Sequence, residues 1–182
     1  MLSLFLVFTP VAFSIRMLLP FYTLYATHVL HVEAFQWALL HFWYLAIFYI
    51  VMLPIGRLVD VFGRKKPLML SSASLAMGIA FFLTGEVFGL YIFHALTAVG
   101  NALAFTAYPS LQADLTPQEY RGRVMGFSNF TDCFLGSGAV LLGGFLYENI
   151  SPVTPFLVQL AVMAIAVQTT HLFVKESEIK EK

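Results

Sequence analysis

Long apolar runs alternate with short polar links along the whole chain. A helix needs roughly 20 apolar residues to cross a bilayer core of about 30 Å, and six runs approach that length. We expect membrane-spanning helices at residues 4–27, 35–53, 67–83, 87–111, 124–146 and 155–174. The pattern therefore predicts an all-α fold, with a polytopic transmembrane domain of six helices over residues 1–174 and a charged tail at residues 175–182.

Composition agrees with a membrane protein and narrows its chemistry. Hydrophobic residues make up 59% of the chain and charged residues 11%, with a mean hydropathy of +0.82, which leaves too few polar side chains to coat a soluble protein. No glycine-rich phosphate loop is present, so we expect any energy source to be an ion gradient. The single Cys133 provides neither a disulfide nor a metal-ligand pair, and no metal or cofactor is expected.

The basic residues are distributed unevenly between two sets of links. Nine of the ten lysines and arginines follow the second, fourth or sixth apolar run, and the three opposite links contain none. Because positively charged loops tend to remain in the cytoplasm, we expect both termini on the cytoplasmic side of the cell (plasma) membrane. The net charge of zero gives no reason to expect a nucleic-acid partner, and the expected surroundings are the lipid bilayer.

The link after the second run carries a charged motif with regularly placed glycines. It reads Gly56-Arg-Leu-Val-Asp60-Val-Phe-Gly63-Arg64-Lys65-Lys66. This segment resembles the signature loop of major facilitator superfamily transporters, roughly Gly-x-Leu-x-Asp-x-x-Gly-Arg-Arg/Lys, which joins the second and third helices of each six-helix half. The resemblance implies a cytoplasmic hinge between paired helices, with every key position of the motif filled.

The link after the fourth run carries a second match. It reads Asp114-Leu-Thr116-Pro117-Gln-Glu119-Tyr-Arg121-Gly. Thr116, followed by Pro117 and then Glu119, has the pattern of a capping box, so the fifth helix is expected to begin here. The link also resembles the Asp-x-x-Pro-x-Glu-x-Arg-Gly segment found before the fifth or eleventh helix in the facilitator superfamily. The two motifs agree in order and spacing.

The resemblance also implies a latch that holds one conformation of a transporter. Carried over by position, Asp60 would face the amino end of a helix in the other half, and Arg64 would pair with Asp114 or Glu119. The same latch includes the remaining key positions, Gly56, Gly63, Lys65 and Arg121. Ordinary topology-setting charges would explain the basic residues of the loop, but not its two glycines or its aspartate.

Two charged residues lie within the predicted spans. Arg16 and Asp132 are candidates for function because an ionisable group inside a membrane costs at least ~3 kcal/mol on insertion scales. Estimated depths of roughly 18 Å and 12 Å from the inner ends of their helices allow the two side chains to pair. Either Arg16 binds an anionic substrate and Asp132 exchanges a proton, or the two form a structural ion pair.

Two histidines lie at similar depth in the second and fourth runs. Histidine titrates near physiological pH, so His41 and His94 suit proton coupling, although a hydrogen-bonded packing role would also explain them. Polar residues recur on one helical face of the fourth run, at His94, Thr97, Asn101 and Tyr108. A surface facing lipid would not tolerate this polar stripe, so we expect it to line a cavity.

The resemblance covers nearly the whole chain, whereas family members usually have twelve helices in two halves with the substrate between them. It therefore implies a secondary active transporter of a small-molecule substrate, working by alternating access with a second six-helix half. That half would be a separate chain, the rest of a truncated or split product, or a second copy in a homodimer. Asp132 and the two histidines make a proton gradient the expected energy source. The glycine-rich run 138–144 lacks the Gly-Pro pair of antiporters, which favours the C-terminal half of a transporter.

Two other classes of protein remain as alternatives. The chain would then be a non-transporting membrane subunit or an inactive fragment of a transporter. An intramembrane protease would need a dyad of Ser137 with His94 or His171, and its Gly-x-Ser-Gly motif would require a glycine at Leu135. We therefore expect that the chain is not an enzyme.

Overall fold

The computed structural model describes residues 2–174. These residues form six α-helices, α1 (Leu2–His28), α2 (Ala34–Phe62), α3 (Lys65–Phe82), α4 (Val87–Asp114), α5 (Arg121–Asn149) and α6 (Thr154–Phe173), with a short 3-10 helix, η1 (Gln118–Tyr120), before α5. The predicted all-α fold of six helices is confirmed. The expected charged tail at residues 175–182 lies outside the described residues.

Five of the six helices are long and apolar enough to cross a membrane. The exception is α3, which has only 18 residues and begins with two lysines. It packs against α4 and α6, and its buried face carries Ser71, Ser72 and Ser74. The protein, rather than lipid, therefore supplies much of the surroundings of α3.

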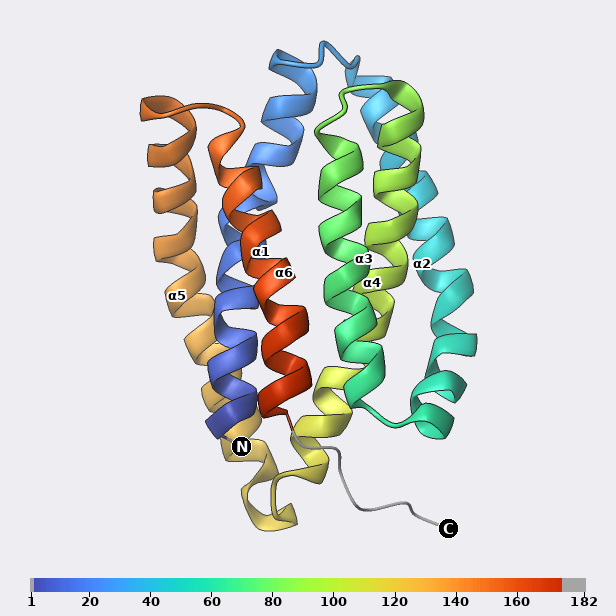
Figure 1. Ribbon diagram of the computed structural model, residues 1–182, viewed down its shortest axis with the longest axis vertical. Coiled ribbons are helices and arrows are strands. Elements are labelled where there is room, and N and C mark those ends of the chain that lie inside the picture. Colours follow the sequence, from blue (N-terminus) through green and yellow to red (C-terminus); the bar gives the residue numbers. More distant parts are fainter. Residues whose placement is uncertain (1, 175–182) are drawn as a thin grey trace.

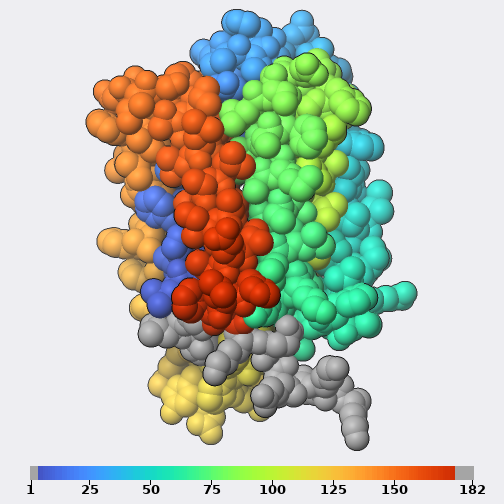
Figure 2. All heavy atoms as spheres, viewed as in Figure 1, coloured from blue at the N-terminus to red at the C-terminus, as the bar shows by residue number. Residues whose placement is uncertain are grey.

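The helices form two groups of three that meet at the centre of the bundle (Figure 1). One group packs α1 against α5 and α6, the other packs α4 against α2 and α3, and α3 joins α6 across the junction. In the space-filling view, atoms of α3 and α6 fill the centre of this face (Figure 2). The start of α1, the α2–α3 link and the α4–α5 link lie at one end, which we call the basic end.

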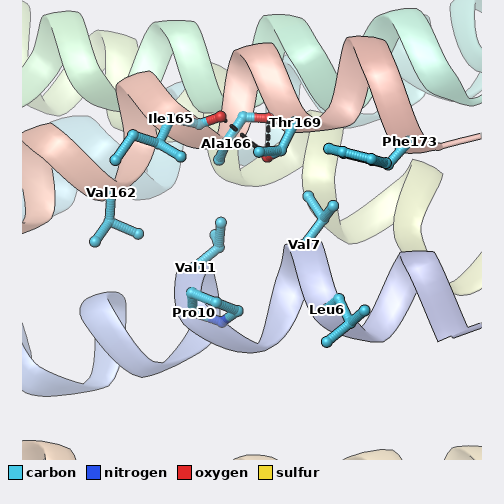
Figure 3. Close-up of a pocket in the computed structure, with 9 residues that line it drawn as sticks. All are labelled: Leu6, Val7, Pro10, Val11, Val162, Ile165, Ala166, Thr169 and Phe173. Atoms are coloured by element: carbon cyan, nitrogen blue, oxygen red, sulfur yellow. Dashed lines mark hydrogen bonds between the residues drawn. The ribbon is translucent and has the colours of Figure 1, made fainter.

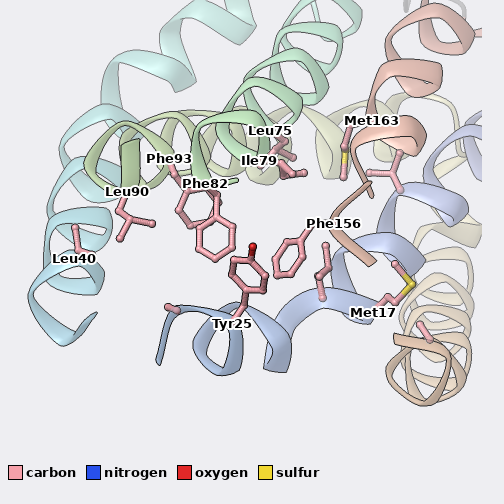
Figure 4. Packing of buried hydrophobic residues seen from close by; sticks show 14 of the residues in the cluster. Met17, Tyr25, Leu40, Leu75, Ile79, Phe82, Leu90, Phe93, Phe156 and Met163 are labelled. Carbon is pink, nitrogen blue, oxygen red and sulfur yellow. The ribbon is translucent and has the colours of Figure 1, made fainter. Parts of the chain in front are cut away.

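Aromatic rings form the core of the end away from the basic end. Figure 4 shows Tyr25, Phe82, Phe93 and Phe156 converging from α1, α3, α4 and α6. The ring centroids lie 4.8 Å apart for Phe82 and Phe93, and 5.0 Å apart for Tyr25 and Phe156. Such contacts add to the energy of apolar packing. This cluster therefore holds the two groups of three helices together.

Close helix packing occurs where glycine leaves room for a neighbouring backbone. A Cβ at Gly143 of α5 would lie 2.5 Å from the Met17 carbonyl oxygen of α1, and one at Gly100 of α4 would lie 3.1 Å from the Ser71 carbonyl oxygen of α3. Three other glycines of α5 have nothing within 4 Å of this position, namely Gly122, Gly126 and Gly138. These three glycines make no close helix contact within the described residues.

The α2–α3 link is shorter than the sequence suggested. Helix α2 continues to Phe62, so most of the signature motif is helical, and only Gly63 and Arg64 separate α2 from α3. The side chains of Ile55 and Val59 are buried in the apolar cluster at the basic end. Their burial explains why α2 extends beyond its predicted span.

The capping box expected in the α4–α5 link is wrong as a description of how α5 begins. The segment starts with η1, and α5 has Tyr120 at its N-cap, with no side-chain cap bond at either element in this described stretch. The Thr116 hydroxyl instead donates to the Gln112 carbonyl oxygen at 2.6 Å. Thr116 is buried against the end of α4, which turns its hydroxyl back toward that helix.

Candidate functional site

Gly63 gives the signature loop its shape. Its backbone has φ 82° and ψ 179°, a combination that is essentially restricted to glycine. The turn places Arg64 at the start of α3, where its Nε lies 2.9 Å from Oδ2 of Asp114 at the end of α4. The N–H is not aimed closely enough for a hydrogen bond, so the contact is an ion pair. Such a partly exposed pair contributes on the order of 1 kcal/mol.

Two more basic side chains brace the same end of the bundle. Lys65 Nζ donates to the His171 carbonyl oxygen at 2.7 Å, which satisfies one of the last carbonyl groups of α6. Arg121 Nε donates to the carbonyl oxygens of Ala113 and Thr116, at 3.1 Å and 3.3 Å. The signature loop and the α4–α5 link are thus tied to the ends of α6 and α4.

Three residues of the predicted latch take no part in these contacts. Asp60 is exposed on α2, and no described cation forms an ion pair with it. Glu119 is exposed in η1, so Arg64 pairs with Asp114 and not with Glu119. A Cβ at Gly56 would meet nothing within 4 Å. Gly56 and Asp60 therefore lie on a surface that the described part of the chain leaves open.

A cavity of about 320 Å³ lies between helices of both groups, away from the basic end, and we call it the histidine cavity. Its walls are mostly aromatic and polar, and include Tyr22, Thr23, Trp37, His41, Tyr44, Phe93, His94, Thr97, Asn101 and Gln159. The ring centroids of His41 and His94 lie 5.6 Å apart. His41 is exposed, whereas His94 is buried. Both histidines and Asn101, which were candidates from the sequence, meet in this cavity.

Hydrogen bonds already connect the walls of the histidine cavity. Four of them are Trp37 Nε1–H to Thr23 Oγ1 (3.1 Å), Tyr22 O–H to Gln159 Oε1 (2.8 Å), Asn101 Nδ2–H to Tyr44 Oη (3.1 Å) and His94 Nδ1–H to the Leu90 carbonyl (2.8 Å). The bond of His94 fixes its ring, because it leaves only Nε2 for another partner. The polar groups of this cavity therefore stabilise its walls.

A second cavity, of about 410 Å³, adjoins the first and lies nearer the basic end. We call it the aspartate cavity. One carboxylate and five rings line it, namely Asp132, Phe8, Tyr44, Phe48, Phe105 and Tyr108. Asp132 is the one charged side chain among the lining residues, and within the described chain it has neither an ion pair nor a hydrogen bond. Asn101 and Tyr44 border both cavities.

Arg16 does not form the ion pair with Asp132 that the depth estimates allowed. Its side chain is exposed, and its methylene groups pack on Gly136, where a Cβ would lie 3.1 Å from Arg16 Cγ. The two charges are close enough to attract each other, but no ion pair joins them among the described residues. The rise along a helix sets the depth of a residue and not the direction of its side chain, which is why the estimate was incomplete.

A third cavity is an apolar groove between α1 and α6, with a volume of about 350 Å³. Figure 3 shows Val7, Val11 and Pro10 of α1 facing Ile165 and Ala166 of α6 across it. The one hydroxyl in its lining, that of Thr169, already donates to carbonyl oxygens of α6 (Figure 3). The groove offers an apolar surface and no free polar group, so it does not suit a polar solute.

The residues of the protease alternative lie apart. The Ser137 hydroxyl donates to the Cys133 carbonyl oxygen at 3.0 Å on an exposed face of α5. His94 lies on α4 and His171 on α6, and neither forms a hydrogen bond with Ser137 in the part of the chain that the structure describes. No serine–histidine dyad is assembled from these residues.

Comparison with known families identifies the fold. The family model of the Major Facilitator Superfamily matches residues 4–182. The chain belongs to the Major Facilitator Superfamily. Members of this superfamily are transporters, so the long apolar helices of this superfamily chain are those of a multi-pass membrane protein.

Known proteins resemble this superfamily chain over part of their length. The vacuolar membrane amino acid uptake transporter fnx2 of Schizosaccharomyces pombe is 29% identical over 117 residues, which cover 61% of this chain and 19% of the relative. Multidrug resistance protein 2 of Bacillus subtilis is 31% identical over 126 residues, covering 67% and 30%. Magnetosome protein MamH of Paramagnetospirillum magneticum is 29% identical over 108 residues, covering 57% and 25%. Each match thus spans less than a third of the relative.

Sequence reasoning missed most of the aromatic walls. Tyr44 and Phe48 of α2 and Phe105 of α4 lie within apolar runs, where a ring facing a cavity and a ring facing lipid look alike. Gln159 carried a usable signal, because a buried amide inside an apolar span needs a partner. That partner is the Tyr22 hydroxyl.

Proposed function

We propose that this chain is one six-helix half of a secondary active transporter of a small solute, working by alternating access with a second half. The observation that carries the proposal is the pair of adjoining cavities in a chain whose superfamily transports solutes. Cavities of several hundred Å³ with apolar walls and a few polar groups are typical of small-molecule sites. The substrate binds in these cavities, and the second half closes them.

Open surfaces on α2 and α5 support a second half. These two helices bury the smallest shares of their residues among the five candidate spans. Gly56 on α2, and Gly122 and Gly126 on α5, have free space where a neighbouring helix would pack. The second half is a separate chain, the remainder of a longer product, or a second copy in a homodimer.

The contacts at the basic end act as the latch of this transporter. Arg64 and Asp114 join α3 to α4 within this half, while Lys65 and Arg121 hold the ends of α6 and α4. Asp60, which has no ion-pair partner among the described residues, faces the positive amino end of a helix in the second half. Asp60→Asn therefore lowers the uptake rate without unfolding the chain, whereas the control Glu86→Gln leaves uptake unchanged.

Proton coupling and orientation complete the proposal. Asp132, His41 and His94 are the side chains in the cavities that can accept and release a proton. The basic end faces the cytoplasm, with both termini on the cytoplasmic side of the plasma membrane. An imposed proton gradient then drives uptake in vesicles, and a protonophore abolishes it; uptake that is indifferent to both contradicts the coupling.

The deciding experiment is native mass spectrometry of the assembly extracted in mild detergent, followed by flux assays. A particle of twice the 20.3 kDa chain mass, or one that holds a second protein, supports the two-half transporter. A stable 20.3 kDa monomer without flux supports the alternative, an inactive fragment or a non-transporting subunit. The experiment includes this alternative because each match covers less than a third of the relative's length.

A further inference from the structure

Asp132 stands alone as a charge in an aromatic cavity. Two pairs of aromatic rings line the same cavity, with centroids 5.1 Å apart for Phe8 and Tyr108, and 6.3 Å apart for Phe48 and Phe105. Faces of aromatic rings are negative and attract cations, whereas they offer nothing to an anion. The cavity therefore combines a formal negative charge with negatively polarised walls.

The surroundings of Asp132 leave its carboxylate available. Ser128, one turn before it on α5, has its hydroxyl 3.4 Å from the Tyr108 hydroxyl, so these two polar groups contact each other. Arg16 carries the nearby positive charge but rests on Gly136 and does not line the cavity. A half-buried carboxylate that has neither an ion pair nor a hydrogen bond among the described residues is costly, and a bound cation would reduce that cost.

Pro109 removes one helical hydrogen bond of α4 beside the same cavity. Proline has no N–H, so Pro109 cannot donate to the Phe105 carbonyl oxygen one turn earlier in α4. Both residues line the aspartate cavity. A carbonyl without its usual helical donor can turn its negative end toward a cation.

The geometry points to an organic cation with a bulky apolar body as the substrate class of the aspartate cavity, an inference that rests on the proposed function. The positive centre contacts Asp132, and the apolar body lies between Phe8, Phe48 and Phe105. This assignment replaces the anionic substrate that Arg16 suggested from the sequence, because Arg16 lines neither this cavity nor the histidine cavity.

The test compares two probes of the same shape and opposite charge, tetraphenylphosphonium and tetraphenylborate. Binding of each is measured on the intact protein assembly in lipid nanodiscs, with empty nanodiscs subtracted. We expect tetraphenylphosphonium to bind about tenfold or more tightly than tetraphenylborate. Asp132→Asn removes this preference, while Asp132→Glu keeps it. Equal binding of the two probes, no binding of the cation, or an unchanged preference in Asp132→Asn overturns the assignment.

Two matched variants separate the site from general charge effects. Glu148→Gln removes one negative charge from an exposed position on the same helix, and its probe preference stays that of the wild type. Arg16→Gln removes the neighbouring positive charge and raises the affinity for tetraphenylphosphonium about threefold, as lower repulsion requires. A loss of tetraphenylborate binding in Arg16→Gln would instead identify Arg16 as an anion site and overturn the proposal.

Flux measurements distinguish this inference from the proposed function. Suppose that a two-half assembly transports a neutral or anionic solute but does not bind tetraphenylphosphonium. That result would support the proposed transporter function and overturn the organic cation as its substrate class. Binding of tetraphenylphosphonium with the expected Asp132 dependence, but without flux, would support the site and reject the transporter.

Discussion

The histidine cavity and the aspartate cavity adjoin at Tyr44 and Asn101, yet their polar groups are used differently. In the histidine cavity, pairs such as Tyr22 and Gln159 satisfy each other across helices. In the aspartate cavity, Asp132 has no such partner among the described residues. Satisfied polar groups stabilise a fold, whereas an unsatisfied charge costs stability and is available to a ligand. The contrast separates positions that build the bundle from the position that we propose serves binding.

The largest expected effect comes from disrupting the close contact between α1 and α5, the helix that carries Asp132. Gly143→Leu places a side chain where even a Cβ would lie 2.5 Å from the Met17 carbonyl oxygen. We expect a loss of about 3 kcal/mol or more in unfolding free energy, because backbone atoms cannot move aside easily. Thermal unfolding in detergent, followed by tryptophan fluorescence, measures the loss. Gly138→Leu is the control, since nothing lies within 4 Å there, and equal effects would contradict the packing.

The next effect concerns a satisfied pair in the histidine cavity. Tyr22→Phe leaves the Gln159 amide oxygen buried without its donor, which costs about 1–2 kcal/mol in unfolding free energy. The double variant Tyr22→Phe, Gln159→Leu removes both polar groups and recovers part of the loss. The same unfolding assay measures both variants. Wild-type stability in Tyr22→Phe would show that the bond contributes nothing.

Predictability from the sequence also differs between regions. The signature loop was readable because its requirements are local: Gly63 needs a backbone shape that only glycine adopts readily. The motif positions limited the partner of Arg64 to Asp114 or Glu119, and the structure shows Asp114. The helix ends were less predictable. Helix α2 runs into the motif because Ile55 is buried there, and this contact comes from the tertiary fold.

The cavities were predictable only in part. The stripe of His94, Thr97 and Asn101 was readable because a polar face on an apolar helix has to avoid lipid. The direction of Arg16 was not readable, because it depends on how α1 is rotated against α5 at Gly136. Rotation about a helix axis is set by packing between helices, and apolar runs in a membrane carry little periodic signal for it.

A smaller effect compares Asp132 with a carboxylate that does have a partner. In a double-mutant cycle of Arg64→Gln and Asp114→Asn, we expect a coupling energy of about 0.5–1 kcal/mol, since the pair is partly exposed. Salt screens exposed charges, so the coupling falls when unfolding is measured at high ionic strength. A coupling that is zero at low salt would mean that this contact does not hold α3 to α4.

The smallest expected effect on stability is that of Asp132→Asn. Asn keeps the size of the side chain and removes a charge that has no ion-pair partner among the described residues, so we expect unfolding free energy equal to that of the wild type or slightly higher. Asp114→Asn, measured beside it by thermal unfolding, loses its ion pair and is less stable. If Asp132→Asn lost as much stability as Asp114→Asn, the attraction between Asp132 and Arg16 would be structural after all. Unchanged stability together with lost tetraphenylphosphonium binding means that the carboxylate serves the ligand and not the fold.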